Sequence, residues 1–168
     1  PDPFPAGPCT AQLTIPIAQQ VSDYLAANGD RFTRDQIVFV QGGGNDISFQ
    51  LGLLAEGLVS PGEAVAAVGQ AAGELAGQAR RIVAKGATRV VVLNLPEIAD
   101  TPAGKAQPQP VQDLLTFMVG VFNDTLAAGL SGSDVKLFDA YAAVKGVFAN
   151  PGAYLVRELN VPACDKAK

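Results

Sequence analysis

Three short apolar runs, separated by long amphipathic segments, limit the folds that this chain can adopt. Residues 37–40 and 90–93 are unbroken apolar runs rich in β-branched side chains, whereas residues 135–139 begin with an apolar–polar–apolar alternation. Unbroken runs of this length are typical of strands buried on both faces of a parallel sheet, and alternation indicates a strand nearer the edge. The pattern therefore predicts three strands, the third of them closest to an edge.

Helical periodicity fills the intervals between these runs. Ser60, Pro61 and Glu63 form the signature of a capping box with proline in the first turn, which predicts a helix from there to about Lys85. Small residues along its apolar stripe are expected to allow close approach to a sheet. Apolar residues at spacings of three and four predict three further helices. These cover about residues 15–27 (capped by Thr14 and stopped at Gly29), 111–130 and 140–149.

The alternation of strands and helices predicts the fold class. Parallel strands joined through helices require right-handed crossovers, and the helices then cover the faces of the sheet. We therefore expect an α/β fold, a three-layer α/β/α sandwich with a parallel sheet, in a single domain over residues 1–168. At 48% hydrophobic and 17% charged residues, the composition is that of a chain with a packed core.

Charge, hydropathy and cysteine content limit which binding partners and which environment can be expected for this chain. The net charge is −4 and Lys and Arg form no run, which argues against nucleic-acid binding. No apolar stretch approaches the ~18–20 residues needed to span a bilayer, so no membrane span is predicted. Cys9 and Cys164 lie near opposite ends of the sequence. They could form one disulfide, stay as two thiols, or bridge to other segments.

The count of histidines is zero. A Ser-His-Asp or Cys-His catalytic site formed by this chain alone is therefore excluded, whatever the fold. A histidine-based metal site is excluded as well, and two distant cysteines argue against a thiolate metal centre. We therefore expect no metal site in this chain.

One glycine-rich segment is the candidate site. The run at residues 37–40 leads into Gly42, Gly43, Gly44, Asn45 and Asp46. Ligands of open parallel sheets bind beyond the carboxyl ends of the strands. Glycines leave room for a ligand against bare backbone, and the Asn45 amide offers two N–H donors. The residues alone also fit a tight strand exit with Asx-type turns, or a phosphate-cradling loop. The latter lacks the usual Gly-Lys-Ser/Thr and the glycine spacing of a dinucleotide site.

A resemblance adds a third interpretation. Residues 38–46 resemble the third sequence block of the GDSL or SGNH hydrolases, Gly-x-Asn-Asp at the end of a strand. The segments that resemble later parts of that family follow in the same order and extend the resemblance across nearly the whole chain. They are residues 89–96 with Thr101-Pro102, then 122–126 and 135–140, and finally 148–152 and 162–164, which resemble a loop of secreted bacterial members.

The resemblance implies a serine esterase or lipase with a flavodoxin-like sheet of strand order 2-1-3-4-5. This chain would supply strands three to five, so the sheet would be incomplete in it. Asn45 would donate its amide to the oxyanion, Gly43 would be the glycine of the block, and Gly44 and Asp46 would support the loop. The substrate would be a small-molecule or lipid ester, and the reaction would need no metal and no organic cofactor. The enzyme would be secreted or periplasmic.

The chain departs from the family pattern in three places. The Gly-Asp-Ser block with the nucleophile, the oxyanion glycine of the second block and the final Asp-x-x-His block are absent. We expect a missing segment or a second chain to supply the serine and the Asp/His pair, and the 168 residues alone to be inactive. The strand at residues 37–40 would then be unpaired, which favours self-association. A non-catalytic flavodoxin-like module that binds a ligand or partner is the alternative.

Overall fold

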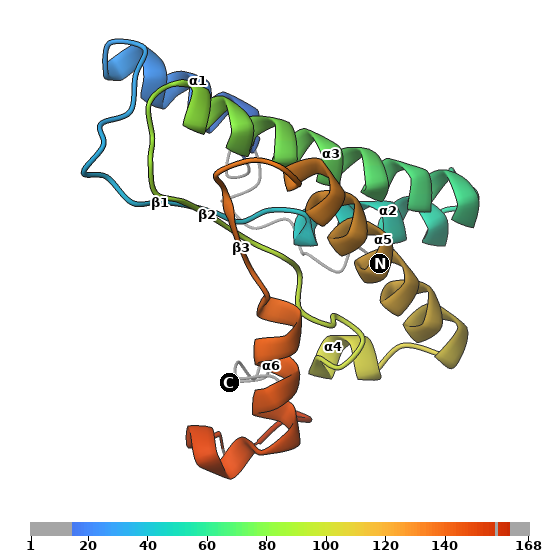
Figure 1. Cartoon of the computed structure of the whole chain (residues 1–168). Coiled ribbons are helices and arrows are strands. Elements are labelled where there is room, and N and C mark those ends of the chain that lie inside the picture. The colour runs from blue at the N-terminus through green and yellow to red at the C-terminus, as the bar shows by residue number, and fades with distance from the viewer. Residues whose placement is uncertain (1–14, 157, 162–168) are drawn as a thin grey trace, which may run out of the picture.

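The computed structural model describes residues 15–156 and 158–161. Its sheet has three parallel strands, β1 (Val38–Val40), β2 (Val90–Leu93) and β3 (Lys136–Phe138), in the order β1-β2-β3 (Figure 1). Val40 pairs with Val92, and Val92 in turn pairs with Leu137. All pairings are parallel, so the predicted parallel α/β fold is confirmed. Each new strand is added at the same edge, which is the order expected for strands three to five.

Six α-helices and one 3₁₀ helix accompany the strands in the described residues. The bounds predicted for the long helices differ from the observed ones by two residues at most, whereas α2 and the short α4 were not predicted. The helices are α1 (Ile17–Ala27), α2 (Gly44–Ala55), α3 (Pro61–Ala84), α4 (Pro102–Lys105), α5 (Gln109–Leu130), α6 (Ala140–Ala149) and the 3₁₀ helix η1 (Pro151–Tyr154).

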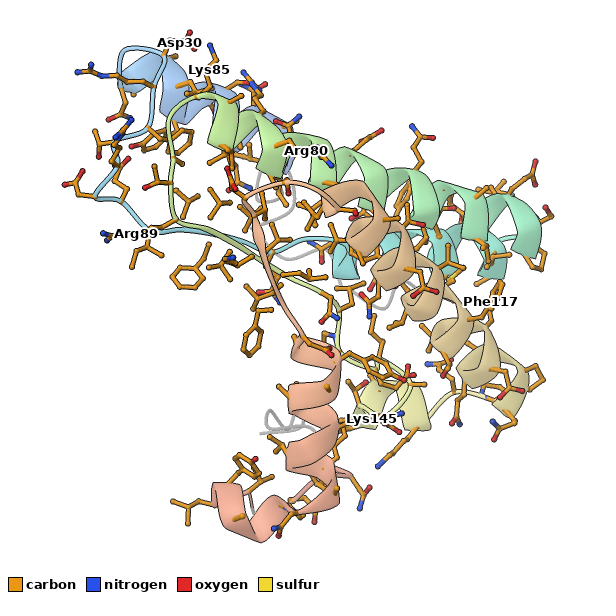
Figure 2. The ribbon with its side chains drawn as sticks, viewed as in Figure 1. Asp30, Arg80, Lys85, Arg89, Phe117 and Lys145 are labelled. Atoms are coloured by element: carbon orange, nitrogen blue, oxygen red, sulfur yellow. The ribbon has the colours of Figure 1, made fainter. Side chains whose placement is uncertain are left out.

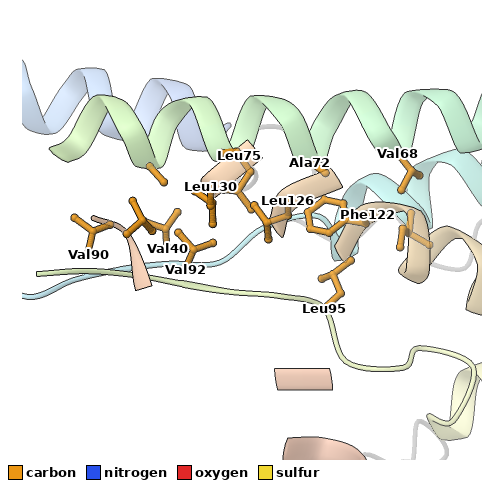
Figure 3. Close-up of a cluster of buried hydrophobic side chains, with 14 of the residues drawn as sticks. Val40, Val68, Ala72, Leu75, Val90, Val92, Leu95, Phe122, Leu126 and Leu130 are labelled. Carbon is orange, nitrogen blue, oxygen red and sulfur yellow. The ribbon is translucent and has the colours of Figure 1, made fainter. Parts of the chain in front are cut away.

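The core lies between the sheet and the pair α3 and α5, with α1 beside α3 (Figure 1). Figure 3 shows Val40, Val90 and Val92 on the side of the strands that faces α3. Phe122 and Leu126 of α5 are fully buried in this layer. Every second residue of β1 and β2 therefore contributes to one core, as the pleat of a strand requires, whereas all three residues of β3 are exposed.

Small residues allow α3 and α5 to approach closely. A Cβ atom on Gly129 would come 2.7 Å from the Cβ of Ala76, so the glycine leaves the room that this contact needs. Nearby, the guanidinium of Arg80 donates to the carbonyls of Gly129 (2.6 Å) and Ser131 (2.7 Å), which satisfies the end of α5 (Figure 2). The small residues of α3 were predicted to allow close approach to a sheet. They also allow close approach to α5.

The opposite face of the sheet is uncovered in the described residues. Ile37 is 58% exposed, Phe39 69% and Phe138 51%, and all three lie on the face away from α3. The prediction that residues 37–40 are buried on both faces is wrong for this chain by itself, because α1, α3 and α5 all lie on the other face. Within the described residues the sandwich consists of the sheet and one helical layer, and the expectation that a further segment completes it stays a prediction.

Local signals for the helix ends were largely right. The capping box of α3 is present, since Ser60 accepts the N–H of Glu63 (3.3 Å) and the Glu63 carboxylate accepts the N–H of Ser60 (2.8 Å). Gly29 follows α1 with φ +66°. The helix begins at Ile17 with Pro16 as its N-cap, however, so the expected start at residue 15 is wrong. The expected cap Thr14 and both cysteines, Cys9 and Cys164, lie outside the described residues.

One helix corrects the expectation about membrane spans. By length and composition α5 is long and apolar enough to cross a bilayer. Its side chains Leu115, Met118 and Phe122 are nevertheless buried against α3 and the sheet. Length and composition alone therefore do not make α5 a membrane span, because core helices pass the same hydropathy test.

Candidate functional site

Strand β1 leads directly into helix α2 at the predicted site. Gly43 is the N-cap of α2 and has φ +104°, a conformation that side chains other than glycine rarely adopt. A Cβ atom there would also overlap the ring of Phe122, which is fully buried. Both the backbone conformation and the packing therefore require glycine at the end of this strand.

Sequence reasoning missed that the segment is the start of a helix. Residues 42–46 were expected to be a loop, whereas α2 begins at Gly44. The signal was present, because Ile47, Leu51 and Leu54 recur at spacings of four and three, and they pack on the core. The Asx-type strand exit is wrong as an interpretation, since Asn45 is a helical residue.

Asn45 is the second residue of α2, and its side chain is exposed. Within residues 15–156 and 158–161 its amide forms no side-chain hydrogen bond. The backbone around it is held firmly, because Gly43 contacts Phe122 and Ile47 is fully buried. The arrangement combines a fixed main chain with an unused donor group.

The first turn of α2 adds electrostatic attraction for an anion. The first intrahelical bond runs from the N–H of Ile47 to the carbonyl of Gly43 (3.1 Å), and no side chain caps the helix. The N–H groups of Gly44, Asn45 and Asp46 therefore lack intrahelical partners and carry the positive end of the helix dipole. This end of α2 favours negative charge, although the Asp46 carboxylate in the same turn offsets part of the effect.

The neighbouring predicted residues differ in what they contribute. A Cβ atom on Gly44 would meet no atom within 4 Å, so the space in front of this backbone is open. Asp46 is exposed, and within the described part of the chain its carboxylate accepts no hydrogen bond, so its role in supporting the loop stays a prediction. The Ser48 hydroxyl donates to the carbonyl of Gly44 (3.0 Å), which leaves it a helix residue without a base.

A second group of polar side chains lies at the carboxyl ends of β2 and β3. The amide of Asn94, only 8% exposed, donates to the carboxylate of Asp139 (3.0 Å) and accepts the N–H of Tyr141 (3.0 Å). Asp139 also accepts the N–H of Ala142 (3.0 Å) as the N-cap of α6. The bonds to Ala142 and then Asn94 lower the pKa of Asp139. Asn94 thus joins the end of β2 to the start of α6.

Helix α5 positions two strand ends through adjacent residues. The amide of Asn123 accepts the N–H of Leu95 (2.8 Å) and donates to the carbonyl of the same residue (2.9 Å), which pins the end of β2. Phe122, the preceding residue, packs against Gly43 at the end of β1. Sequence reasoning assigned no role to Asn123. A polar residue inside a buried helical stripe was the signal for it.

Glu97 is the buried acid of the loop after β2, at 5% exposure. Its carboxylate accepts the N–H of Ala99 (3.2 Å) and the hydroxyl of Tyr141 (3.4 Å). Lys145 in turn donates to the Tyr141 hydroxyl (3.1 Å), and this bond raises the pKa of Lys145 (Figure 2). The three side chains tie the loop to α6. Within the described residues no group of three or more His, Cys, Asp or Glu side chains could hold a metal ion.

A groove of about 250 Å³ follows the free edge of β1, by which we mean the edge that pairs with no other strand among the described residues. Val38 donates its N–H to the carbonyl of Arg89 in the direction of β2 (2.9 Å), so the backbone groups of Phe39 point toward the opposite, unpaired edge. The groove leads to Gln41, four residues before Asn45. Its lining is Ile17, Gln20, Val21, Tyr24, Phe32, Val38, Phe39, Val40, Gln41 and Ile82.

Comparison with known proteins identifies the family of this chain. The family model described as GDSL-like Lipase/Acylhydrolase matches residues 6–155. The chain belongs to the GDSL-like lipase/acylhydrolase family. A relative described as an uncharacterized protein in the trpE-trpG intergenic region of Pseudomonas putida is 33% identical over 122 residues. That match covers 72% of this chain and 18% of the relative, so the chain spans about a fifth of the relative's length.

Acyl transfer passes through a tetrahedral intermediate whose oxygen carries negative charge, and catalysis of it needs donors that are already in place. The Asn45 side chain offers amide donors on a backbone that is anchored at Gly43 and Ile47. The family match agrees with the resemblance of residues 38–46 to the GDSL or SGNH hydrolases.

Proposed function

We propose that this chain supplies the oxyanion-hole amide, Asn45, of a carboxylic ester hydrolase that works through a serine acyl-enzyme. The observation that carries the proposal is the unused Asn45 amide at the end of a parallel strand in a member of this family. In the reaction a serine Oγ attacks the ester carbonyl, and a histidine takes the serine proton and passes it to the leaving alcohol. Water then releases the acid by the same route.

Asn45 acts when the carbonyl oxygen becomes negative. Its N–H donors and the positive end of α2 stabilise that charge more than they stabilise the neutral ester, which lowers the barrier. Because Gly43 and Ile47 hold the backbone, little reorganisation is needed at the moment of reaction. Removing one such donor costs roughly 3–4 kcal/mol of transition-state stabilisation.

The serine and the histidine come from another segment or another chain. The 168 residues contain no histidine, so the base must be supplied from outside them. The free edge of β1 and the groove beside it offer a place where a further strand could pair next to the site. Such pairing would also cover Phe39, which is 69% exposed. A second copy of the chain could pair at the same edge instead. The two copies would then associate without forming an active site.

Two measurements test the proposal. The 168-residue chain alone should hydrolyse p-nitrophenyl butyrate no faster than buffer. In the active hydrolase, with serine and histidine supplied, Asn45→Ala should lower kcat by about 10²–10³ with little change in KM. Ser48→Ala is the matched control on the same helix and should leave kcat unchanged, since its hydroxyl contacts only the carbonyl of Gly44. A kcat within threefold of wild type for Asn45→Ala would refute the role.

A further inference from the structure

Helix α1 ends in an exposed turn in which Asn28 precedes Gly29. The side-chain amide of Asn28 donates to the carbonyl of Tyr24 (2.8 Å). One turn position later, the N–H of Asp30 donates to the carbonyl of Leu25 (2.8 Å). Among the described residues the backbone N–H of Gly29 donates to no backbone carbonyl. The nitrogen that follows Asn28 is therefore not engaged in holding the turn.

An asparagine side chain reacts with the next backbone nitrogen when the chain brings the two together. After a solvent base takes the proton of the Gly29 nitrogen, this nitrogen bonds to Cγ of Asn28. The Cγ–Nδ2 bond breaks, ammonia leaves with a proton from water, and a succinimide ring remains. Water then opens the ring at Cγ, which gives aspartate, or at the backbone carbonyl carbon, which gives isoaspartate with the main chain running through Cγ. Water is the only co-reactant.

The following residue separates Asn28 from the other asparagines of the chain. Glycine has no side chain to hinder the approach of its nitrogen to Cγ, and its backbone rotates most freely. The other asparagines precede proline, which has no N–H to lose, or bulkier residues. They are Asn45, Asn94, Asn123, Asn150 and Asn160. The reaction is therefore expected at Asn28 first.

The fold restrains this reaction only weakly. Asn28 has φ −121° and ψ 27°, so its backbone must rotate and its bond to Tyr24 must break before the Gly29 nitrogen reaches Cγ. Exposed helix ends open with free energies close to zero. A Cβ atom on Gly29 would meet nothing within 4 Å, so the surroundings leave room for the rotation.

We propose that Asn28 is a modification site, where the side chain converts spontaneously to aspartate and isoaspartate and so loosens the end of α1. The acid has no N–H to donate to Tyr24, and the new charge lies at the negative end of the helix, beside Asp30 (Figure 2). Tyr24 stacks on Phe32 with 4.4 Å between ring centroids, and both line the groove at the free edge of β1. The conversion therefore acts on a wall of this groove. It does not depend on the function proposed for Asn45.

Peptide mapping by mass spectrometry, after storage of the 168-residue chain at neutral and at alkaline pH, tests the modification. The peptide with Asn28 should gain the mass difference between O and NH roughly tenfold faster than any other asparagine peptide. The gain should be faster at alkaline pH, because the Gly29 nitrogen must lose its proton.

A pair of glycine variants isolates the role of the neighbouring residue. Gly29→Ala should slow the conversion about tenfold, because the methyl group hinders the attack. Gly132→Ala is the matched control. Gly132 also has a positive φ (+72° against +66°), and a Cβ atom there also meets nothing within 4 Å, but no asparagine precedes it. It should leave the rate at Asn28 unchanged.

Asn28→Asp measures the effect on the fold, through hydrogen exchange followed by NMR. The N–H of Asp30, which closes the turn, should exchange about two- to fivefold faster than in the unmodified chain. Asn160→Asp adds the same charge elsewhere and should leave this rate unchanged. Equal conversion at Asn28 and at other asparagines, or a rate that Gly29→Ala does not lower, would overturn the modification site. Unchanged exchange at Asp30 in Asn28→Asp would overturn its effect on α1.

Discussion

Replacing Gly43 by alanine tests how the fold holds the candidate site. Alanine at φ +104° is strained by about 1–3 kcal/mol. The new methyl group would also overlap the ring of Phe122, which is fully buried, and such overpacking costs about 1–3 kcal/mol. Gly43→Ala should therefore lower the free energy of unfolding by about 2–6 kcal/mol, a large part of the 5–15 kcal/mol that is typical of a domain.

The adjacent glycine provides the control. Gly44 is a helical residue, and a Cβ atom there meets nothing within 4 Å, so Gly44→Ala should change stability by less than about 0.5 kcal/mol or raise it by up to about 1 kcal/mol. Urea unfolding followed by far-UV circular dichroism measures both variants. The explanation is refuted if Gly43→Ala costs less than about 1 kcal/mol or no more than Gly44→Ala.

A double-mutant cycle with Phe122→Leu separates the two causes. Leucine removes the ring atoms that the new methyl group would meet, whereas the strain at φ +104° remains. The cost of Gly43→Ala should therefore be smaller in the Phe122→Leu background, with a coupling energy of about 1–3 kcal/mol. A coupling energy near zero would show that the ring is not the obstacle.

Three further predictions concern α6, α3 and the open sheet face. Because hydrogen bonds from Ala142 and Asn94 lower the pKa of Asp139, its stabilising effect is present above the unfolded pKa of about 3.8 and is lost as the pH falls through the folded value. Asp139→Asn should therefore reduce the loss in the free energy of unfolding that occurs as the pH is lowered. An unchanged pH dependence of this free energy would contradict the reasoning. Ser60→Ala removes the cap of α3 and should cost about 1 kcal/mol in urea unfolding, whereas Ser48→Ala, at an exposed position within α2, should cost less than half as much. Phe39→Ser should reduce self-association of the isolated chain in sedimentation velocity while changing stability by less than about 0.5 kcal/mol; a wild-type chain that is monomeric at high concentration would refute the reason for this prediction.

Local features of the sequence determined most of the secondary structure. The β-branched runs at residues 37–40 and 90–93 became β1 and β2, because strand preference and apolar character act over a few neighbouring residues. The capping box at Ser60 formed as predicted, since its two partners are three residues apart. The position of Asn45 at the end of a parallel strand followed from the same local reading.

Only the tertiary structure decided which faces are buried and how the site is held. Residues 37–40 have the apolar pattern of a doubly buried strand, yet Phe39 is exposed, because burial depends on what packs against each face. The contact of Gly43 with Phe122 and the bond between Asn94 and Asp139 join residues 79 and 45 positions apart. Contacts at such separations arise from packing of the whole chain, and no local pattern encodes them.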